Sequence, residues 1–411
     1  MRSSDGYPPP PTTADSTARP VPRRGHLGSW SLAQILAAEA SVLAVIAGLT
    51  QGLLPTVIAA AFAAVLLLVF FSRRQDRWWL EHRRIARALH RRRAARLESD
   101  AGPLLAALRT IAPGLTVRDI PAPHNGTTVA GAARDGTGVA RDGTGVARDE
   151  AGWFSVVALD PATGPLPLDA LAGLLNSTDQ PGVVLALVTH TIPAPSPDVH
   201  PDSPAGSSYR QLVQAVSPAP VPAHRETSIS VRVDARLLAE ALLDHTADPE
   251  SAAALAAGLG RKLVTNLRRL GLTARTLNAG EIVASLSRSC DVAPGTDVDE
   301  SWTHWRSARL THRTYWLRTW PAQVAEISSL FAWAATAPVA LTSTALILSA
   351  NGQDITVRAL LRLATRPEAD LQALDRMLLE GALQMATELQ PLDGEHGPAT
   401  YATAPTGGGP G

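Results

Sequence analysis

Two apolar runs near the N-terminus dominate the hydropathy pattern of the chain. Residues 53–71 read LLPTVIAAAFAAVLLLVFF, nineteen residues without a charge. As a helix this run would extend roughly 28 Å and match the hydrocarbon core of a bilayer. The preceding run, residues 31–49, is also apolar apart from Gln34 and Glu39. The pattern predicts a transmembrane hairpin over residues 29–72.

Glu39 lies near the middle of the first apolar run. A carboxylate inside a membrane helix is costly unless it is protonated, paired or close to the surface. It is either neutral and hydrogen-bonded to a neighbouring helix or a partner protein, or it carries a proton or an ion. We favour the first interpretation and keep Glu39 as a candidate partner-contact residue.

Arginines flank the predicted hairpin on both sides, whereas the connecting residues 50–52 carry no charge. The flanking arginines are Arg19, Arg23 and Arg24 before the first run and Arg73, Arg74 and Arg77 after the second. The positive-inside rule then places both termini in the cytoplasm and predicts a multi-pass protein of the inner (plasma) membrane. A cleaved signal peptide is disfavoured by the proline-rich residues 1–24 and by the second, longer apolar run.

Residues 73–98 hold ten arginines against three acidic residues. This composition predicts a basic juxtamembrane helix attracted to anionic lipid, by about 1 kcal/mol for each favourably placed arginine. Trp78 and Trp79 open the segment, as interfacial anchors do. We therefore add these tryptophans and the preceding Arg73, Arg74 and Arg77 to the candidate membrane or partner contacts.

After residue 99 the spacing of apolar residues becomes typical of strands alternating with helices. We therefore expect an α/β domain that extends to residue 403. Short apolar or alternating runs predict strands at 153–159, 183–189, 226–234, 272–277, 309–320, 339–348 and 355–364. Helical patterns fall at 104–111, 236–245, 251–270, 279–289 and 367–388. Because helices follow strands in the middle of this order, we predict a parallel or mixed sheet covered by helices.

Four segments are expected to lack regular structure or to form loops. Residues 1–28 and 404–411 are predicted to be disordered tails, and the proline-rich residues 192–222 a loop. The heptad ARDGTGV occurs at 133–139 and 140–146, followed by the variant ARDEAGW at 147–153. Three short copies cannot build a solenoid, so the repeat is interpreted as a lengthened strand-turn segment.

Composition limits the partners. Lys plus Arg and Asp plus Glu number 37 each, so no global charge favours nucleic acid. Cys290 is the single cysteine, which rules out an intramolecular disulfide and fits a reducing compartment.

The densest polar cluster is Asp297-Val298-Asp299-Glu300, followed by His304 and His312. Asp-x-Asp can hold a divalent metal and a nucleotide sugar, so Asp297 and Asp299 define an alternative in which the chain is a membrane-anchored glycosyltransferase. The simpler interpretation is an acidic turn before an aromatic strand. Nucleophile, zinc-protease and phosphate-loop motifs are missing from the sequence. We predict that the protein is not an enzyme and has no catalytic, metal or cofactor-binding residues.

The C-terminal half carries short aromatic motifs in a definite order. These are Trp302-x-x-Trp305, His312-x-Thr314-Tyr315, Trp320-Pro321, a strand at 342–348 and Pro391-Leu392-Asp393-Gly394-Glu395. Together with GVARDEAGWFSVV at 145–157, this order resembles the EccE family of type VII (ESX) secretion systems of actinobacteria. The resemblance covers most of residues 29–405; the heptad repeat and the region 192–222 depart from it.

The resemblance implies a non-catalytic structural subunit of an inner-membrane translocation complex that supports assembly and protein export. Its implied partners are the EccB, EccC and EccD components, of which EccC is the ATPase. It also implies a degenerate glycosyltransferase-like fold for the cytosolic domain.

Overall fold

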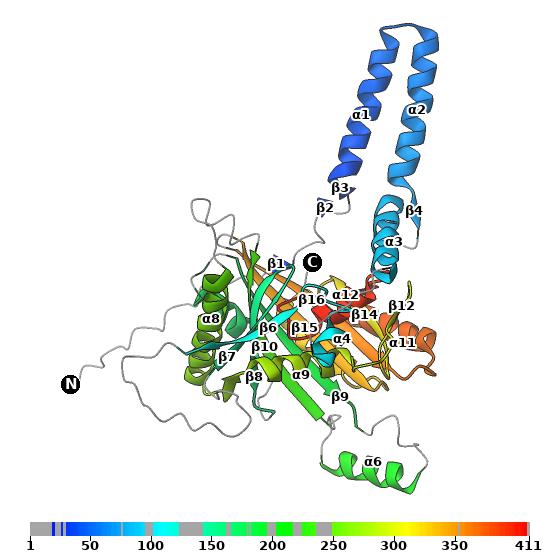
Figure 1. The fold of residues 1–411 in the computed structure, drawn as a ribbon. Helices are drawn as coiled ribbons and strands as arrows, with labels where there is room; N and C mark the ends of the chain where they lie inside the picture. The colour runs from blue at the N-terminus through cyan, green and yellow to red at the C-terminus, as the bar shows by residue number, and fades with distance from the viewer. Residues whose placement is uncertain are drawn as a thin grey trace, which may run out of the picture.

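The structure is a computed structural model in which a helical arm projects from a sheet domain (Figure 1). It describes residues 19–20, 26–27, 30–74, 77–94, 102–122, 143–161, 166–178, 180, 182–194, 203–216, 224–235, 249–351 and 354–408. Most of the predicted N-terminal tail, the first heptad copy at 133–139, residues 140–142 of the second copy and the predicted helix at 236–245 lie outside the described residues.

The arm begins with two antiparallel helices, α1 (Leu32–Leu49) and α2 (Leu53–Phe71). Gly48 permits their close approach, because a Cβ there would lie 2.9 Å from the Cα of Thr56. At the other end, Gln34 Nε2 donates to the Phe70 carbonyl at 3.0 Å. The two apolar runs therefore form a packed helical pair whose polar Gln34 is satisfied internally.

Two very short strands and a third helix connect the arm to the domain. β4 (Arg73–Arg74) pairs with β5 (Arg77–Trp78), and α3 (Trp79–Ala94) follows. The strands β2 (His26–Leu27) and β3 (Trp30–Ser31) form a similar pair before α1. The predicted basic helix is thus present over part of the expected range 73–98.

The domain is built on a 13-stranded sheet with the path β12-β13-β14-β16-β15-β9-β10-β8-β7-β6. Three strands lie off this path: β1 pairs with β16, β11 pairs with β8, and β17 pairs with β14. The strands are β1 (Arg19–Pro20), β6 (Thr116–Pro121), β7 (Gly143–Asp149), β8 (Gly152–Leu159), β9 (Val183–Ile192), β10 (His224–Asp234), β11 (Ala274–Thr276), β12 (Asp299–Glu300), β13 (Trp305–Arg306), β14 (Thr311–Thr319), β15 (Leu341–Asn351), β16 (Asp354–Thr365) and β17 (Glu388–Pro391).

The predicted parallel or mixed sheet is wrong for the principal strands, which pair antiparallel. β8 and β9 do run in the same direction, as a helical connection through α5 (Leu168–Asn176) favours, but β10 lies between them and is antiparallel to both. β10 and β11 are likewise separated by β8. Among the described residues, the one parallel pair is the two-residue contact of β1 with β16. The sequence pattern thus indicated strand direction but not which strands become neighbours.

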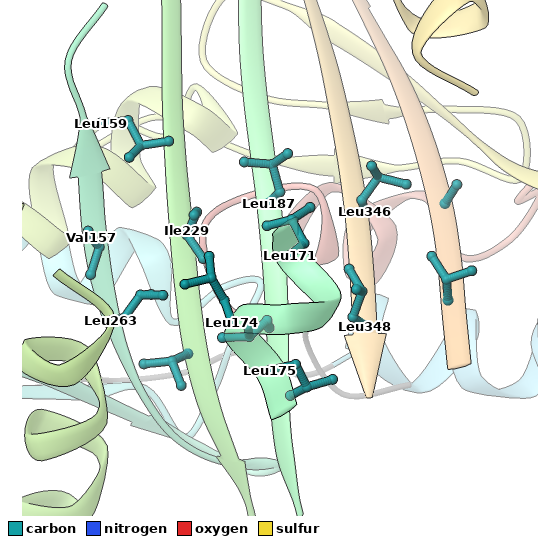
Figure 2. Packing of buried hydrophobic residues seen from close by; sticks show 14 of the residues in the cluster. Val157, Leu159, Leu171, Leu174, Leu175, Leu187, Ile229, Leu263, Leu346 and Leu348 are labelled. Atoms are coloured by element: carbon teal, nitrogen blue, oxygen red, sulfur yellow. The ribbon is translucent and has the colours of Figure 1, made fainter. Parts of the chain in front are cut away.

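Helices cover both faces of the sheet because successive strand residues point to opposite sides. On one face, α5 and α8 (Pro249–Arg269) pack on the strands; Figure 2 shows Leu171 beside Leu187, Leu174 beside Ile229 and Leu263 beside Val157. On the other face, Phe154 and Val156 pack with residues of α4 (Pro103–Leu108) and α9 (Ala279–Cys290). The remaining helices are α6 (Pro204–Val216), α10 (Ile327–Ala334), α11 (Leu371–Gln384) and α12 (His396–Ala402), with a short 3-10 turn at Val324–Glu326.

The proline-rich region 192–222 is not a loop throughout, because it contains α6. Pro204 occupies the helix start, where its lack of an N–H is tolerated, and residues 205–216 contain no further proline. The prolines therefore flank this helix rather than interrupt it.

The C-terminal residues 404–408 are buried, contrary to the predicted disordered tail over 404–411; the last three residues lie outside the described part. Arg232 Nε donates to the Thr406 carbonyl at 2.7 Å, and the Gly407 N–H donates to Ser230 Oγ at 2.7 Å. Gly407 has a φ of 76°, and a Cβ there would lie 2.5 Å from the Cβ of Arg232. Glycine is present because the backbone must approach the sheet closely.

A buried ion pair lies beneath this C-terminal segment. Arg232 makes two hydrogen bonds of 2.6 Å to the two carboxylate oxygens of Asp149, and Tyr401 donates to Asp149 Oδ2 at 2.9 Å. Because buried charges need partners, α12 and the residues after it complete the hydrogen bonding of the sheet rather than merely covering it.

A second buried polar cluster surrounds Arg362, which is fully inaccessible. Its Nη1 contacts His312 Nδ1 at 3.0 Å and its Nη2 donates to Ser343 Oγ at 2.9 Å. Ser343 Oγ also contacts His190 Nδ1 at 2.8 Å. Burial and the adjacent Arg362 cation lower the pKa of His190 to about 3 and hold the pKa of His312 well below its usual value.

We expect the stability of the protein to fall as the pH drops below about 6.5. His190 and His312 are neutral when folded, but in the unfolded chain they take up protons near pH 6.5, so acid favours unfolding. Each such histidine removes up to about 1.4 kcal/mol per pH unit, and for His190 the loss continues towards pH 3. Thermal unfolding of the detergent-solubilised chain between pH 7.5 and 4 measures this slope.

The control is a comparison of two histidine substitutions. His190→Gln should flatten the dependence between pH 6.5 and 4, whereas His224→Gln, at an exposed position of β10, should leave it unchanged. Equal slopes in all three proteins would contradict the assignment.

Candidate functional site

The arm meets the domain along α3, and this junction is the most distinctive constellation outside the core. Ile85 and Leu89 are buried on one face of α3. His82, one turn before Ile85, packs against Trp302 in a tilted ring contact with centroids 4.4 Å apart. One apolar face of an otherwise basic helix is therefore held against the domain.

Charged hydrogen bonds fix the other end of α3. Arg92 donates from Nε and Nη2 to the two carboxylate oxygens of Glu300, each at 2.8 Å, and Nη2 also donates to the Gly394 carbonyl at 2.7 Å. Glu300 accepts a further bond of 3.0 Å from the Gly397 N–H. The neighbouring Arg93 donates to the Glu300 carbonyl. A bidentate pair of this kind fixes orientation as well as position.

Gly394 completes the junction. Its φ is 76°, and a Cβ would lie 2.6 Å from Ile85 Cγ2 and 2.6 Å from the Trp302 ring. Its N–H donates to the Trp302 carbonyl at 2.6 Å. The Pro391–Glu395 and Trp302-x-x-Trp305 motifs, far apart in the sequence, therefore meet at α3.

A cavity of about 360 Å³ opens beside the ion pair. Its lining mixes charge, with Arg92, Arg93, Asp299 and Glu300 beside Thr110 and Trp305. Arg92 and Glu300 neutralise each other, so the cavity presents no concentrated charge of one sign. It is a feature of the junction rather than a pocket selective for an ion.

The predicted acidic and histidine candidates do not come together as a metal site. Asp297 and Asp299 are exposed, while His312 is fully buried in the Arg362 cluster. His304 contacts Thr303 Oγ1 at 3.1 Å, and burial lowers its pKa. Within the described residues, no group of three His, Cys, Asp or Glu side chains is placed to hold a metal ion.

The surroundings of Cys290 also indicate a residue that packs in the core. Cys290 is the last residue of α9; its thiol is buried in the core, and burial raises its pKa to about 11. A thiol that remains protonated and inaccessible is a poor nucleophile.

The predicted membrane contacts lie along the arm. Glu39 is exposed on α1, so α2 does not cover it. Trp78 packs edge-on against Phe71 with centroids 6.1 Å apart, and the Trp79 ring lies 4.8 Å from the guanidinium of Arg83. Arg73, Arg74 and Arg77 belong to β4 and β5, at the end of α2; their side chains lie outside the described part.

The Arg92–Glu300 contact was not predicted from the sequence, because 208 residues separate the two side chains. The nearest indication was the aromatic motif beginning at Trp302, next to Glu300. Arg92 itself is one of ten arginines in its segment, and nothing in the sequence distinguishes it from the others.

The fold and the junction define a sheet-rich domain attached through a basic helix to an apolar N-terminal helix. Of the described helices, α2 is the one long and apolar enough to cross a membrane, with a mean hydropathy of 2.7; the apolar stretch Gln34–Leu49 of α1 is shorter.

The family model described as "Putative type VII ESX secretion system translocon, EccE" matches residues 221–317, a stretch that runs from β10 into β14. The resemblance to the EccE family is thereby confirmed over this part of the chain. No curated protein matches the chain in a sequence comparison.

Removing Glu300 should release α3 from the domain. Glu300→Ala leaves Arg92 and the Gly397 N–H without their acceptor, at a cost of about 2 kcal/mol, or roughly a 30-fold rise in the undocked population. Limited trypsin digestion of the solubilised chain measures this as faster cleavage after the arginines of α3.

Glu388→Ala is the matched control, because it breaks the half-exposed Arg318–Glu388 pair at 3.2 Å instead. It should cleave at the parent rate. If both variants cleave alike, the junction pair does not hold α3.

Proposed function

We propose that this protein is a non-catalytic structural subunit of a type VII secretion translocon, anchored by α1 and α2 in the inner membrane and presenting its sheet domain to the cytoplasm. The observation that carries the proposal is the EccE match over residues 221–317, within the sheet that α3 docks onto. The junction supports it, since it attaches this domain firmly to the apolar arm.

The distribution of exposed apolar side chains supports two spans. Large exposed apolar residues concentrate on the arm and include Leu43, Ile46, Leu53, Leu54, Ile58, Phe62 and Leu68. Such a surface is unfavourable in water and favourable in lipid. The bond from Gln34 to Phe70 removes one polar group from the lipid-facing side of α1, which supports a spanning role for that helix as well.

Charge supports the orientation and the lipid contact. Arginines precede α1 and follow α2, which by the positive-inside rule keeps both ends of the hairpin in the cytoplasm. Arg83, Arg84, Arg87 and Arg91 are exposed or partly exposed along α3. In this arrangement they lie beneath the bilayer, where anionic lipid attracts them.

The partners follow from the resemblance: the EccB, EccC and EccD components, with the EccC ATPase supplying energy. The glycosyltransferase alternative has no support, because Asp297 and Asp299 are exposed and no third ligand joins them among the described residues. We therefore assign the domain a role in assembly and export.

Purification from native membranes tests the role. The tag belongs on the N-terminus, because residues up to Gly408 are buried. In mild detergent the chain should migrate in a large assembly that contains a membrane ATPase, identified by native gel and mass spectrometry. Recovery of a lone protein or a small homo-oligomer, from cells that express the other components, would contradict the proposal.

Glu39 should be needed for assembly through its hydrogen-bonding capacity. Since α2 leaves it exposed among apolar side chains, a helix of another subunit is expected to supply its partner. Glu39→Gln should retain most of the co-purifying assembly, and Glu39→Leu should lose it. Val42→Ile, on the exposed surface of the same helix, is the control. Equal recovery of the assembly with Gln and Leu at position 39 would contradict a role for hydrogen bonding by Glu39.

A further inference from the structure

β16 is paired along nearly all of its length on one side, but along only part of its length by the neighbouring strand on the other side. β15 pairs with β16 from Asp354 to Ala364. β14 pairs with β16 only from Thr365 to Leu360; β17 lies on the opposite side of β14, where Tyr315 and Trp316 pair with both strands. Residues 354–359 of β16 therefore have an edge that β14 does not reach.

The chain's own N-terminal segment lies on this edge. β1 runs parallel to β16, with Arg19 opposite Thr356 and Pro20 opposite Val357 (Figure 1). An edge of this kind presents backbone N–H and C=O groups that need partners and that otherwise pair with other chains. Proline is tolerated in such an edge strand because not every backbone N–H there has to donate a hydrogen bond to a neighbouring strand.

The geometry of the arm lets the same chain reach the edge. The bond between Gln34 and Phe70 shows that the start of α1 lies beside the end of α2. From there, the 16 residues of α3 extend roughly 24 Å and contact the domain from His82 to Arg92. On the other flank, the six Cα–Cα steps from Pro20 to His26 can span at most roughly 22 Å, and the β2–β3 pair adds about 5 Å. The two routes have comparable lengths.

We infer that residues 354–359 of β16 form a strand-accepting site whose occupant is the N-terminal segment around Arg19–Pro20 of the same chain. The domain is then attached to the arm at two places, through the Arg92–Glu300 junction after α2 and through β1 before α1. The junction along α3 already fixes the orientation of the domain at one place, and the second attachment, on another strand, constrains that orientation further. The pairing is independent of the proposed function; its role in orienting the domain beneath a membrane rests on that function.

Disulfide cross-linking tests the occupant. The double variant Arg19→Cys with Thr356→Cys, in the full-length solubilised chain, should form a cross-link within one chain under mild oxidation. Cys290 can remain, since it is buried. Arg19→Cys with Thr116→Cys is the control, because β6 lies at the far end of the strand order from β14 and β16. Mass spectrometry of tryptic peptides identifies the linkage.

A yield no higher than that of the control would overturn the inference. A cross-link mainly between two chains would overturn it as well, because the occupant would then be a second copy. Both results are obtained on the isolated protein, so they do not depend on whether a secretion complex co-purifies.

Hydrogen exchange provides a second measurement that does not perturb β16. Arg19→Pro removes the remaining backbone donor of β1, and exchange in peptides covering residues 354–359 should become faster, with peptides of β9 and β10 unchanged. Arg19→Lys retains the backbone and should exchange like the parent protein. Unchanged exchange in Arg19→Pro would show that β1 does not protect this edge.

Discussion

The position of the helical arm relative to the sheet depends on the carboxylate of Glu300. It accepts two hydrogen bonds from Arg92 of α3 and one from the backbone of Gly397, so it joins the arm to the start of α12. Five residues into α12, Tyr401 donates to Asp149, which pairs with Arg232 in the sheet. A continuous series of hydrogen bonds therefore runs from the basic helix to the buried face of β10.

This series explains why the C-terminal segment is ordered. An isolated Asp149–Arg232 pair would leave part of the guanidinium unsatisfied inside the protein, which is unfavourable. The Thr406 carbonyl accepts from Arg232 Nε, and the glycine after it allows the backbone to come close enough. The C-terminal segment therefore begins at the junction with α3, where Gly397 bonds to Glu300, and ends against Arg232 of β10. It couples the junction structurally to the sheet.

Local features were predictable from the sequence, and long-range ones were not. The uncharged run 53–71 forms α2 with the same bounds, and the aromatic and β-branched runs became β9, β14, β15 and β16. The sheet was predicted to be parallel or mixed because helices follow strands, but the insertion of β10 between β8 and β9 is a choice of neighbours that periodicity does not encode. The composition of the glycine-rich end predicts disorder, because composition cannot show that Gly407 lies close to Arg232. Arg92 and Glu300 become partners only through the fold.

The chain's perturbed titratable groups have structural causes. Shifted pKa values often mark active sites, provided that the groups face a cleft. Here His190, His312 and Cys290 are buried in the core, where desolvation keeps them uncharged and substrate has no access. Among the described residues, the accessible Asp297 and Asp299 join no group that could hold a metal ion, while Glu300 beside them is engaged with α3. The polar groups that are well organised in the described part of the chain connect helices, strands and the C-terminal segment to one another.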